Sequence, residues 1–129
     1  MEWVTSDELN RRIEDFRNVG GVVVFVNCAE IESRSSLDSA MRRSIPLDPR
    51  IDLAVPNWDS LQDSLFGGFE QMGIQRAVLV FARALPVRDL PKQVSQMLDD
   101  TVSTVASQLA VPRTQGAAMF LEILFELSV

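Results

Sequence analysis

Three carboxylates at helical spacing are the residues of this sequence best placed to do chemistry. Asp59, Asp63 and Glu70 would share one face of a helix, with Phe66 among them. The like charges of Asp59 and Asp63 repel each other slightly, and Asp63 lies beyond the first helical turn, where the helix dipole favours negative charge. An aromatic ring among acids is typical of a protein-binding surface. Alternatively, Phe66 packs beneath the preceding loop or the N-terminal helix, and the acids are only solvated.

The segment around these carboxylates holds most of the negative charge of the chain. Residues 46–72 contain five acids and one base, a charge of −4 within a net charge of −6. A basic protein partner would complement this charge, although acidity also favours solubility by itself. We expect no direct binding to nucleic acid, because such binding requires Lys and Arg to neutralise phosphates.

The chain contains no histidine, the residue that enzymes and metal sites use most often. Ser-His-Asp and Cys-His nucleophile systems are excluded, as is the commonest metal ligand. The chain also contains no tyrosine, no GxGxxG pattern and no P-loop. We therefore expect a protein that is not an enzyme and that holds neither a metal nor a cofactor. An enzyme that uses Asp59 and Asp63 as a carboxylate pair is the alternative.

The overall composition predicts one globular domain, since 47% of the 129 residues are hydrophobic and 23% are charged. No apolar run approaches the roughly 20 residues that cross a bilayer, and the first residues are acidic, unlike a signal peptide. The single Cys28 allows no internal disulfide. These features predict a cytoplasmic protein that does not bind membranes. No feature of the sequence specifies an oligomeric state.

Residues 57–72 predict the helix that carries the carboxylates. Asn57 is its expected N-cap, and Gly73 is its expected stop. Asp59 and Asp63 are expected to be exposed, because the opposite stripe of the helix contains five apolar residues: Trp58, Leu61, Leu65, Phe69 and Met72.

Residues 3–18 predict an additional helix that packs on the core. Thr5 and Glu8 have the spacing of a capping box at its start, and Gly20 with Gly21 ends it.

Two more helices are predicted from their caps and apolar faces. The serines within residues 33–36 can cap a short helix that turns Leu37, Ala40 and Met41 inward before Pro46. Pro91 fits the first turn of a long helix that stops before Pro112. Its inward face contains Val94, Leu98, Val102, Val105 and Leu109.

Three apolar runs predict strands, at residues 22–27, 77–84 and 119–127. In the last run every odd position is apolar, whereas the even positions include Glu122 and Glu126. Helices separate the three runs, so the strands are expected to form a parallel three-stranded sheet in an α/β fold.

Residues 57–65, Asn-Trp-Asp-Ser-Leu-Gln-Asp-Ser-Leu, resemble the motif that opens the second helix in the barstar family of ribonuclease inhibitors. In that motif, Asn and an aromatic residue or Leu precede Asp-x-Leu-x-Asp-x-Leu. The order of predicted elements over residues 21–129 is similar as well. The resemblance implies a three-stranded parallel sheet packed with helices, to which residues 1–20 add a helix.

The resemblance also implies a function, which is to occlude the basic active site of a ribonuclease or related nuclease toxin as an inhibitor or immunity protein. By position, Asp59 and Asp63 match the family's inhibitory aspartates, and Gly67 matches a glycine that lets the partner approach. The implied partner-binding residues, from the helix and the loop before it, are Asp52, Leu53, Asp59, Gln62, Asp63, Phe66, Gly67 and Glu70.

The sequence departs from the family at three places. Ala54, Val55 and Pro56 stand where an aromatic-glycine pair is usual, and Gln62 stands where an aromatic residue faces the partner. Residues 101–111 lack the carboxylate that the family carries late in its long helix. The fold inference is unaffected by these departures, whereas inhibition of the classical ribonuclease does not follow from the motif alone. The alternative is a barstar-fold interaction or regulatory module whose partner is not a nuclease.

Overall fold

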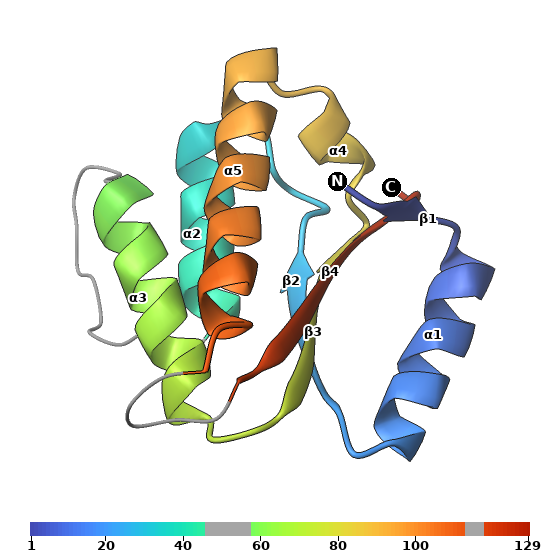
Figure 1. Cartoon of the computed structure of the whole chain (residues 1–129). Coiled ribbons are helices and arrows are strands. Elements are labelled where there is room, and N and C mark those ends of the chain that lie inside the picture. The colour runs from blue at the N-terminus through green and yellow to red at the C-terminus, as the bar shows by residue number, and fades with distance from the viewer. Residues whose placement is uncertain (46–57, 113–117) are drawn as a thin grey trace.

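A parallel sheet with helices on both faces organises the protein in a computed structural model, which describes residues 1–45, 58–112 and 118–129 but not the side chains of Trp58 and Asp59. Within these ranges the strands are β1 (Trp3–Val4), β2 (Val22–Asn27), β3 (Arg76–Ala82) and β4 (Phe120–Glu126). They lie in the order β1-β4-β3-β2, and each neighbouring pair is parallel (Figure 1). The predicted α/β class and the parallel pairing of the three predicted strands are confirmed.

The expectation of three strands is wrong, because the chain begins with a fourth. Trp3 and Val4, predicted as the start of a helix, instead pair with Phe125 and Glu126 of β4. Thr5 is the N-cap and has an extended backbone, so the helix begins only at Ser6. The residues before the cap satisfy their backbone groups on the edge of β4, where Leu127 N donates to Val4 O at 2.8 Å.

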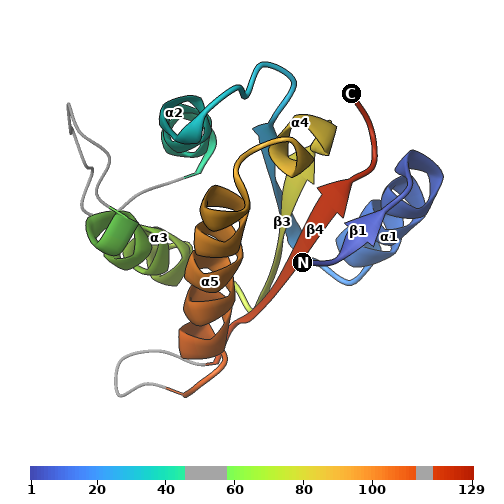
Figure 2. The ribbon, with the colours of Figure 1, turned by 90° about the horizontal axis from the view of Figure 1, so that it is seen from above.

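The helices divide unequally between the two faces of the sheet. One face carries α2 (Arg34–Ser44), α3 (Trp58–Gln71) and α5 (Lys92–Leu109), whereas the other carries α1 (Ser6–Asn18) (Figure 2). A short helix, α4 (Leu85–Arg88), joins β3 to α5 and was not predicted. In the described ranges, no helix combines the length and apolarity needed to cross a membrane.

The central strand β3 contributes to a core on each face. Ala77, Leu79 and Phe81 join the larger core beneath α2, α3 and α5, whereas Val78 and Val80 join a smaller core beneath α1. All five are at most 2% exposed, which explains why the run is apolar at every position and does not alternate.

The N-terminal helix α1 is joined tightly to β2. Gly21 N donates to Phe16 O and Gly20 N donates to Arg17 O, both at 3.0 Å, in the pattern of a Schellman motif. Gly20 has a φ of +80°, which favours glycine. A side chain at Gly21 would collide with the ring of Phe16. The glycine pair therefore ends the helix, as predicted, and lets Phe16 close over the turn.

Arg12 connects α1 to the sheet beneath it. Its guanidinium pairs with Glu2, before β1, and with Glu122 of β4. The hydrogen bond to Glu2 raises the pKa of Arg12, against the smaller lowering caused by burial.

The α2 helix buries one residue more than its sequence predicts. Leu37, Ala40 and Met41 are buried as expected, but Asp38 is also only 5% exposed. Asp38 Oδ2 lies 3.0 Å from Nε of Arg42, one helical turn later, so a cation accompanies the buried carboxylate.

The single cysteine is buried where β2 ends. Its thiol donates to Val26 O at 3.5 Å, and burial raises the pKa of Cys28 from 9.0 to about 12. Folding therefore favours the protonated thiol.

The raised pKa of Cys28 predicts how stability depends on alkaline pH. Between pH 9 and pH 12 the unfolded chain loses a proton that the folded chain retains, so the free energy of unfolding should fall as pH rises. The slope should reach about 1.4 kcal/mol per pH unit. Urea unfolding across this window measures it, and Cys28→Ala should flatten it. Equal slopes for the variant and the wild type would contradict the prediction.

The cap of α2 predicts a second stability difference. Ser33 Oγ accepts from Ser36 N at 3.2 Å, and Ser36 Oγ accepts from Ser33 N at 2.9 Å. Ser33→Ala should therefore lower the free energy of unfolding by about 1 kcal/mol. The matched control is Ser35→Ala, an exposed serine of the first turn, which should change it by less than about 0.5 kcal/mol. If chemical denaturation shows the same loss of unfolding free energy for both variants, the cap at Ser33 does not contribute the predicted stability.

Candidate functional site

The α3 helix is held by a buried stripe along one side. Leu61, Leu65 and Phe69 are each at most 1% exposed and belong to the larger core, as predicted. The helix packs mainly against α5, beside which it lies in Figure 1. It ends at Gln71, and Gly73 follows with a φ of +64°, which agrees with its predicted role as a stop.

The side of α3 opposite this stripe presents carboxylates to solvent. Asp63 and Glu70 are both exposed, as expected from their positions. The Asp63 carboxylate has no hydrogen bond or ion pair with any residue that the structure describes. Its negative charge is therefore uncompensated by the described part of the chain, on a helix whose other side is fixed in the core.

The remaining described residues of the predicted surface lie on its flanks. Phe66 is half-buried and packs against the larger core, so its ring is neither free in solvent nor fully enclosed. Gln62 and Gly67 are also half-buried. The alternative that Phe66 packs beneath the N-terminal helix is wrong, because α1 lies on the opposite face of the sheet, and the loop before α3 lies outside the described residues.

The predicted partner-binding residues at the start of the surface lie outside the described residues. These are Asp52 and Leu53 of the preceding loop and the side chain of Asp59. The expected burial of Trp58 and the expected cap at Asn57 lie outside them too. The structure therefore brings together Gln62, Asp63, Phe66, Gly67 and Glu70 on one helix.

The arrangement on α3 suits electrostatic recognition. A carboxylate on a packed helix has a defined position before a partner arrives, which reduces the cost of ordering it on binding. In the described part of the chain, no cluster of three or more Cys, Asp or Glu residues could hold a metal ion. The chemistry that the exposed residues offer is attraction of a cationic surface, with a partly accessible aromatic ring beside the charge.

The later residues of α5, the helix that packs against α3, carry no charge. Ser103, Thr104, Ser107 and Gln108 are exposed there, and none carries a charge. The absence of a carboxylate from residues 101–111 therefore leaves polar, uncharged groups on this part of the surface.

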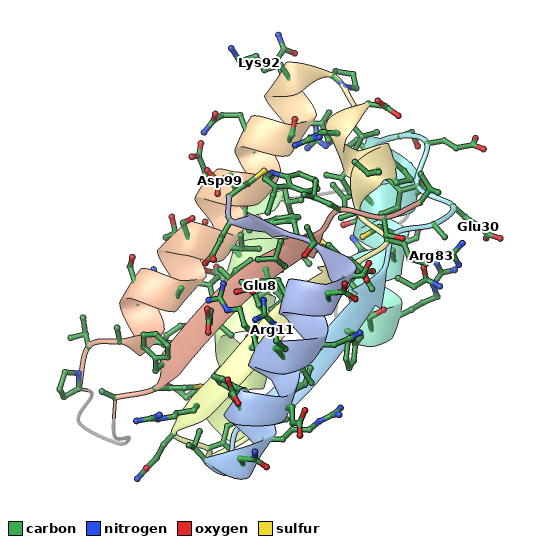
Figure 3. The ribbon with its side chains drawn as sticks, turned by 90° about the vertical axis from the view of Figure 1, so that its right-hand side faces the viewer. Glu8, Arg11, Glu30, Arg83, Lys92 and Asp99 are labelled. Carbon is green, nitrogen blue, oxygen red and sulfur yellow. The ribbon has the colours of Figure 1, made fainter. Side chains whose placement is uncertain are left out.

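A concave feature that the sequence did not predict lies where β2 and β3 end. A cleft of about 580 Å³ is lined by the first turn of α2 and by residues that include Asn27, Glu30, Arg43 and Arg83. Figure 3 shows Glu30 and Arg83 on this side of the molecule. Arg83 Nε donates to Val129 O at 2.9 Å, so the C-terminal residue holds its side chain. The sequence feature that could have predicted this cleft is the location of its residues just after two strands. Ligands of parallel sheets commonly bind beyond the carboxyl ends of the strands.

Comparisons with known proteins provide no relative from which a site could be transferred. The chain matches no protein-family model, and no curated protein or solved structure matches it significantly. The function of the α3 surface must therefore be inferred from its own residues and from the motif at residues 57–65.

Proposed function

We propose that this protein is a barstar-like inhibitor or immunity protein, which binds the basic active site of a ribonuclease or related nuclease toxin. The observation that carries the proposal is the position of Asp63. This carboxylate is exposed on a helix fixed by Leu61 and Leu65, and it has no partner in the described part of the chain. It also stands at the position of an inhibitory aspartate in the family motif.

The proposed mechanism is occlusion. A nuclease active site holds Arg and Lys where they bind substrate phosphate, and a fixed carboxylate can take the place of that phosphate. Asp63 would enter this site, while Glu70 and the accessible part of Phe66 would contact its rim. Long-range attraction would increase the association rate, whereas close pairing of desolvated charges would slow dissociation.

The arrangement of elements supports a barstar-like fold. Strands β2, β3 and β4 are parallel, and the helices between them cover one face of the sheet. The extra elements, β1 and α1, add to the far edge and the opposite face, so they do not cover α3 (Figure 2). An immunity protein of this kind would act in the cytoplasm of the cell that makes the toxin.

A second candidate function is a regulatory or interaction module that uses the same surface on a basic partner other than a nuclease. The supporting observation is the neutral stretch of α5, where Ser103, Ser107 and Gln108 are exposed but no acid is present. Fewer carboxylates would match a site with fewer cations than a ribonuclease presents.

The proposal predicts that Asp63→Ala weakens binding to the partner by at least about 2 kcal/mol, the scale of an interface hot spot. The partner would be obtained by capture on the immobilised wild-type protein at low salt and release at high salt. Titration calorimetry would then compare the variants, and stopped-flow mixing should show an association rate that falls as salt is added.

The matched control is Asp15→Ala, which removes the same charge from an exposed position on α1, across the sheet from α3. It should change the binding free energy by no more than about 0.5 kcal/mol. Asp38 is unsuitable as a control because it is buried with Arg42. If Asp63→Ala binds the partner with wild-type affinity, the α3 surface is not the interface. The captured protein would also be assayed for RNA cleavage. If adding the wild-type protein abolishes that cleavage, the inhibitor is supported over the regulatory or interaction module.

A further inference from the structure

The edge strand β2 directs a defined set of backbone groups away from the sheet. Val24 pairs with Leu79 of β3, and Val26 pairs with Phe81. Cys28 N continues this ladder by donating to Ala82 O at 2.9 Å. In a parallel ladder, the N–H and C=O of one residue point to the same side and alternate along the strand. Because the even-numbered residues face β3, the odd-numbered residues face outward.

The three outward-facing residues of β2 are Val23, Phe25 and Asn27. Within the described ranges, no residue forms a hydrogen bond with their backbone N–H or C=O groups. The strand lies at one end of the sheet, opposite β1 (Figure 2). An uncovered edge of this kind can pair with another strand.

The composition of β2 does not protect this edge. Natural edge strands commonly carry charged residues or proline, or they are very short. The strand sequence, Val-Val-Val-Phe-Val-Asn, contains neither a charge nor a proline. Its six residues contrast with the two residues of β1 at the other end of the sheet. The side chain of Phe25 is 43% exposed beside this edge.

We propose that β2 pairs with β2 of a second copy of this chain, antiparallel about a two-fold axis, to form one continuous sheet. If Phe25 lies on the axis, it exchanges both backbone hydrogen bonds with Phe25 of the partner subunit. Val23 and Asn27 then exchange theirs with Asn27 and Val23 of the partner subunit. This register uses every outward N–H and C=O group of the strand, whereas shifting it leaves groups at the ends unpaired.

The net negative charge of the chain disfavours contacts between copies through acidic surfaces and leaves the uncharged β2 strand as a suitable contact. A chain with a net charge of −6 repels itself, so stable self-association requires a contact surface without acids. The β2 strand itself contains no acid, and a two-fold axis makes its edge complementary to itself. The two Phe25 side chains would then lie beside each other on one face of the joined sheet, adding aromatic contact to the hydrogen bonds.

The proposed pairing goes beyond the function proposed for α3 and does not depend on it. Helices α2 and α1 pack on β2 from its two faces, whereas α3 packs mainly on α5. The exposed side of α3 would therefore remain available in each subunit, and the dimer would present two acidic surfaces.

Sedimentation velocity over a range of concentrations tests the pairing. The wild type should shift from the monomer mass to twice that mass as concentration rises. Phe25→Lys should raise the dimer dissociation constant at least about tenfold, because it places like charges opposite each other on the axis. The matched control is Phe120→Lys, which changes a more exposed phenylalanine, at 59%, on β4, across β3 from β2, and should leave the dissociation constant unchanged.

Amide exchange of the wild type, followed by NMR, provides a test that does not depend on a variant's folding. The amides of Val23, Phe25 and Asn27 should become protected as concentration rises, whereas those of Val24 and Val26 should be protected throughout. A monomer at every concentration would overturn the proposal. So would a dimer that Phe25→Lys leaves intact, or outward amides whose exchange is independent of concentration.

Discussion

The burial of β3 on both faces is the constraint on which the rest of this structure depends. Ala77 to Phe81 are apolar without alternation, so neither face of the central strand can be left in water. Helices α2, α3 and α5 cover one face, and α1 covers the other. Phe81 stacks on Phe125 with ring centroids 4.6 Å apart, and Trp3 packs on Phe125 at 5.1 Å. One aromatic row thus ties β3, β4 and β1 together.

The need to cover the second face makes α1 part of the fold, although its sequence resembles an added element. Pairing of β1 with β4 places the start of α1, and the glycine turn before β2 places its end. Between them, Arg12 pairs with Glu2 and Glu122, which joins the helix to the strand below. This coverage is incomplete, because Phe25 at the edge of the sheet remains partly exposed.

Some acids of this chain are engaged within the molecule, whereas others, such as Asp63 and Asp15, have no side-chain partner in the described part of the chain. In the described part of the chain, Asp38 is buried beside Arg42, and Asp99 pairs with the N-terminal ammonium group at 3.3 Å. These carboxylates are engaged within the molecule. Asp63 has no such partner there, and the packed side of α3 fixes its position. Attraction of an external cation is the interaction that this arrangement leaves available.

The sequence by itself determined the approximate positions of β2, β3 and β4 and of the four longer helices, because local signals specify them, but it predicted neither β1 nor α4. The apolar runs, the cap at Ser33 and the stop at Gly73 act within a few residues, and helical periodicity separates exposed Asp63 from buried Leu61 and Leu65. The pairing of Trp3 and Val4 with β4, the burial of Asp38 and the partial burial of Phe66 were decided only by tertiary structure. Each depends on segments distant in sequence or on the packing of a whole layer, which local periodicity does not contain. The outward amides of β2 belong to the same class, since only the order of strands decides which backbone groups remain unpaired.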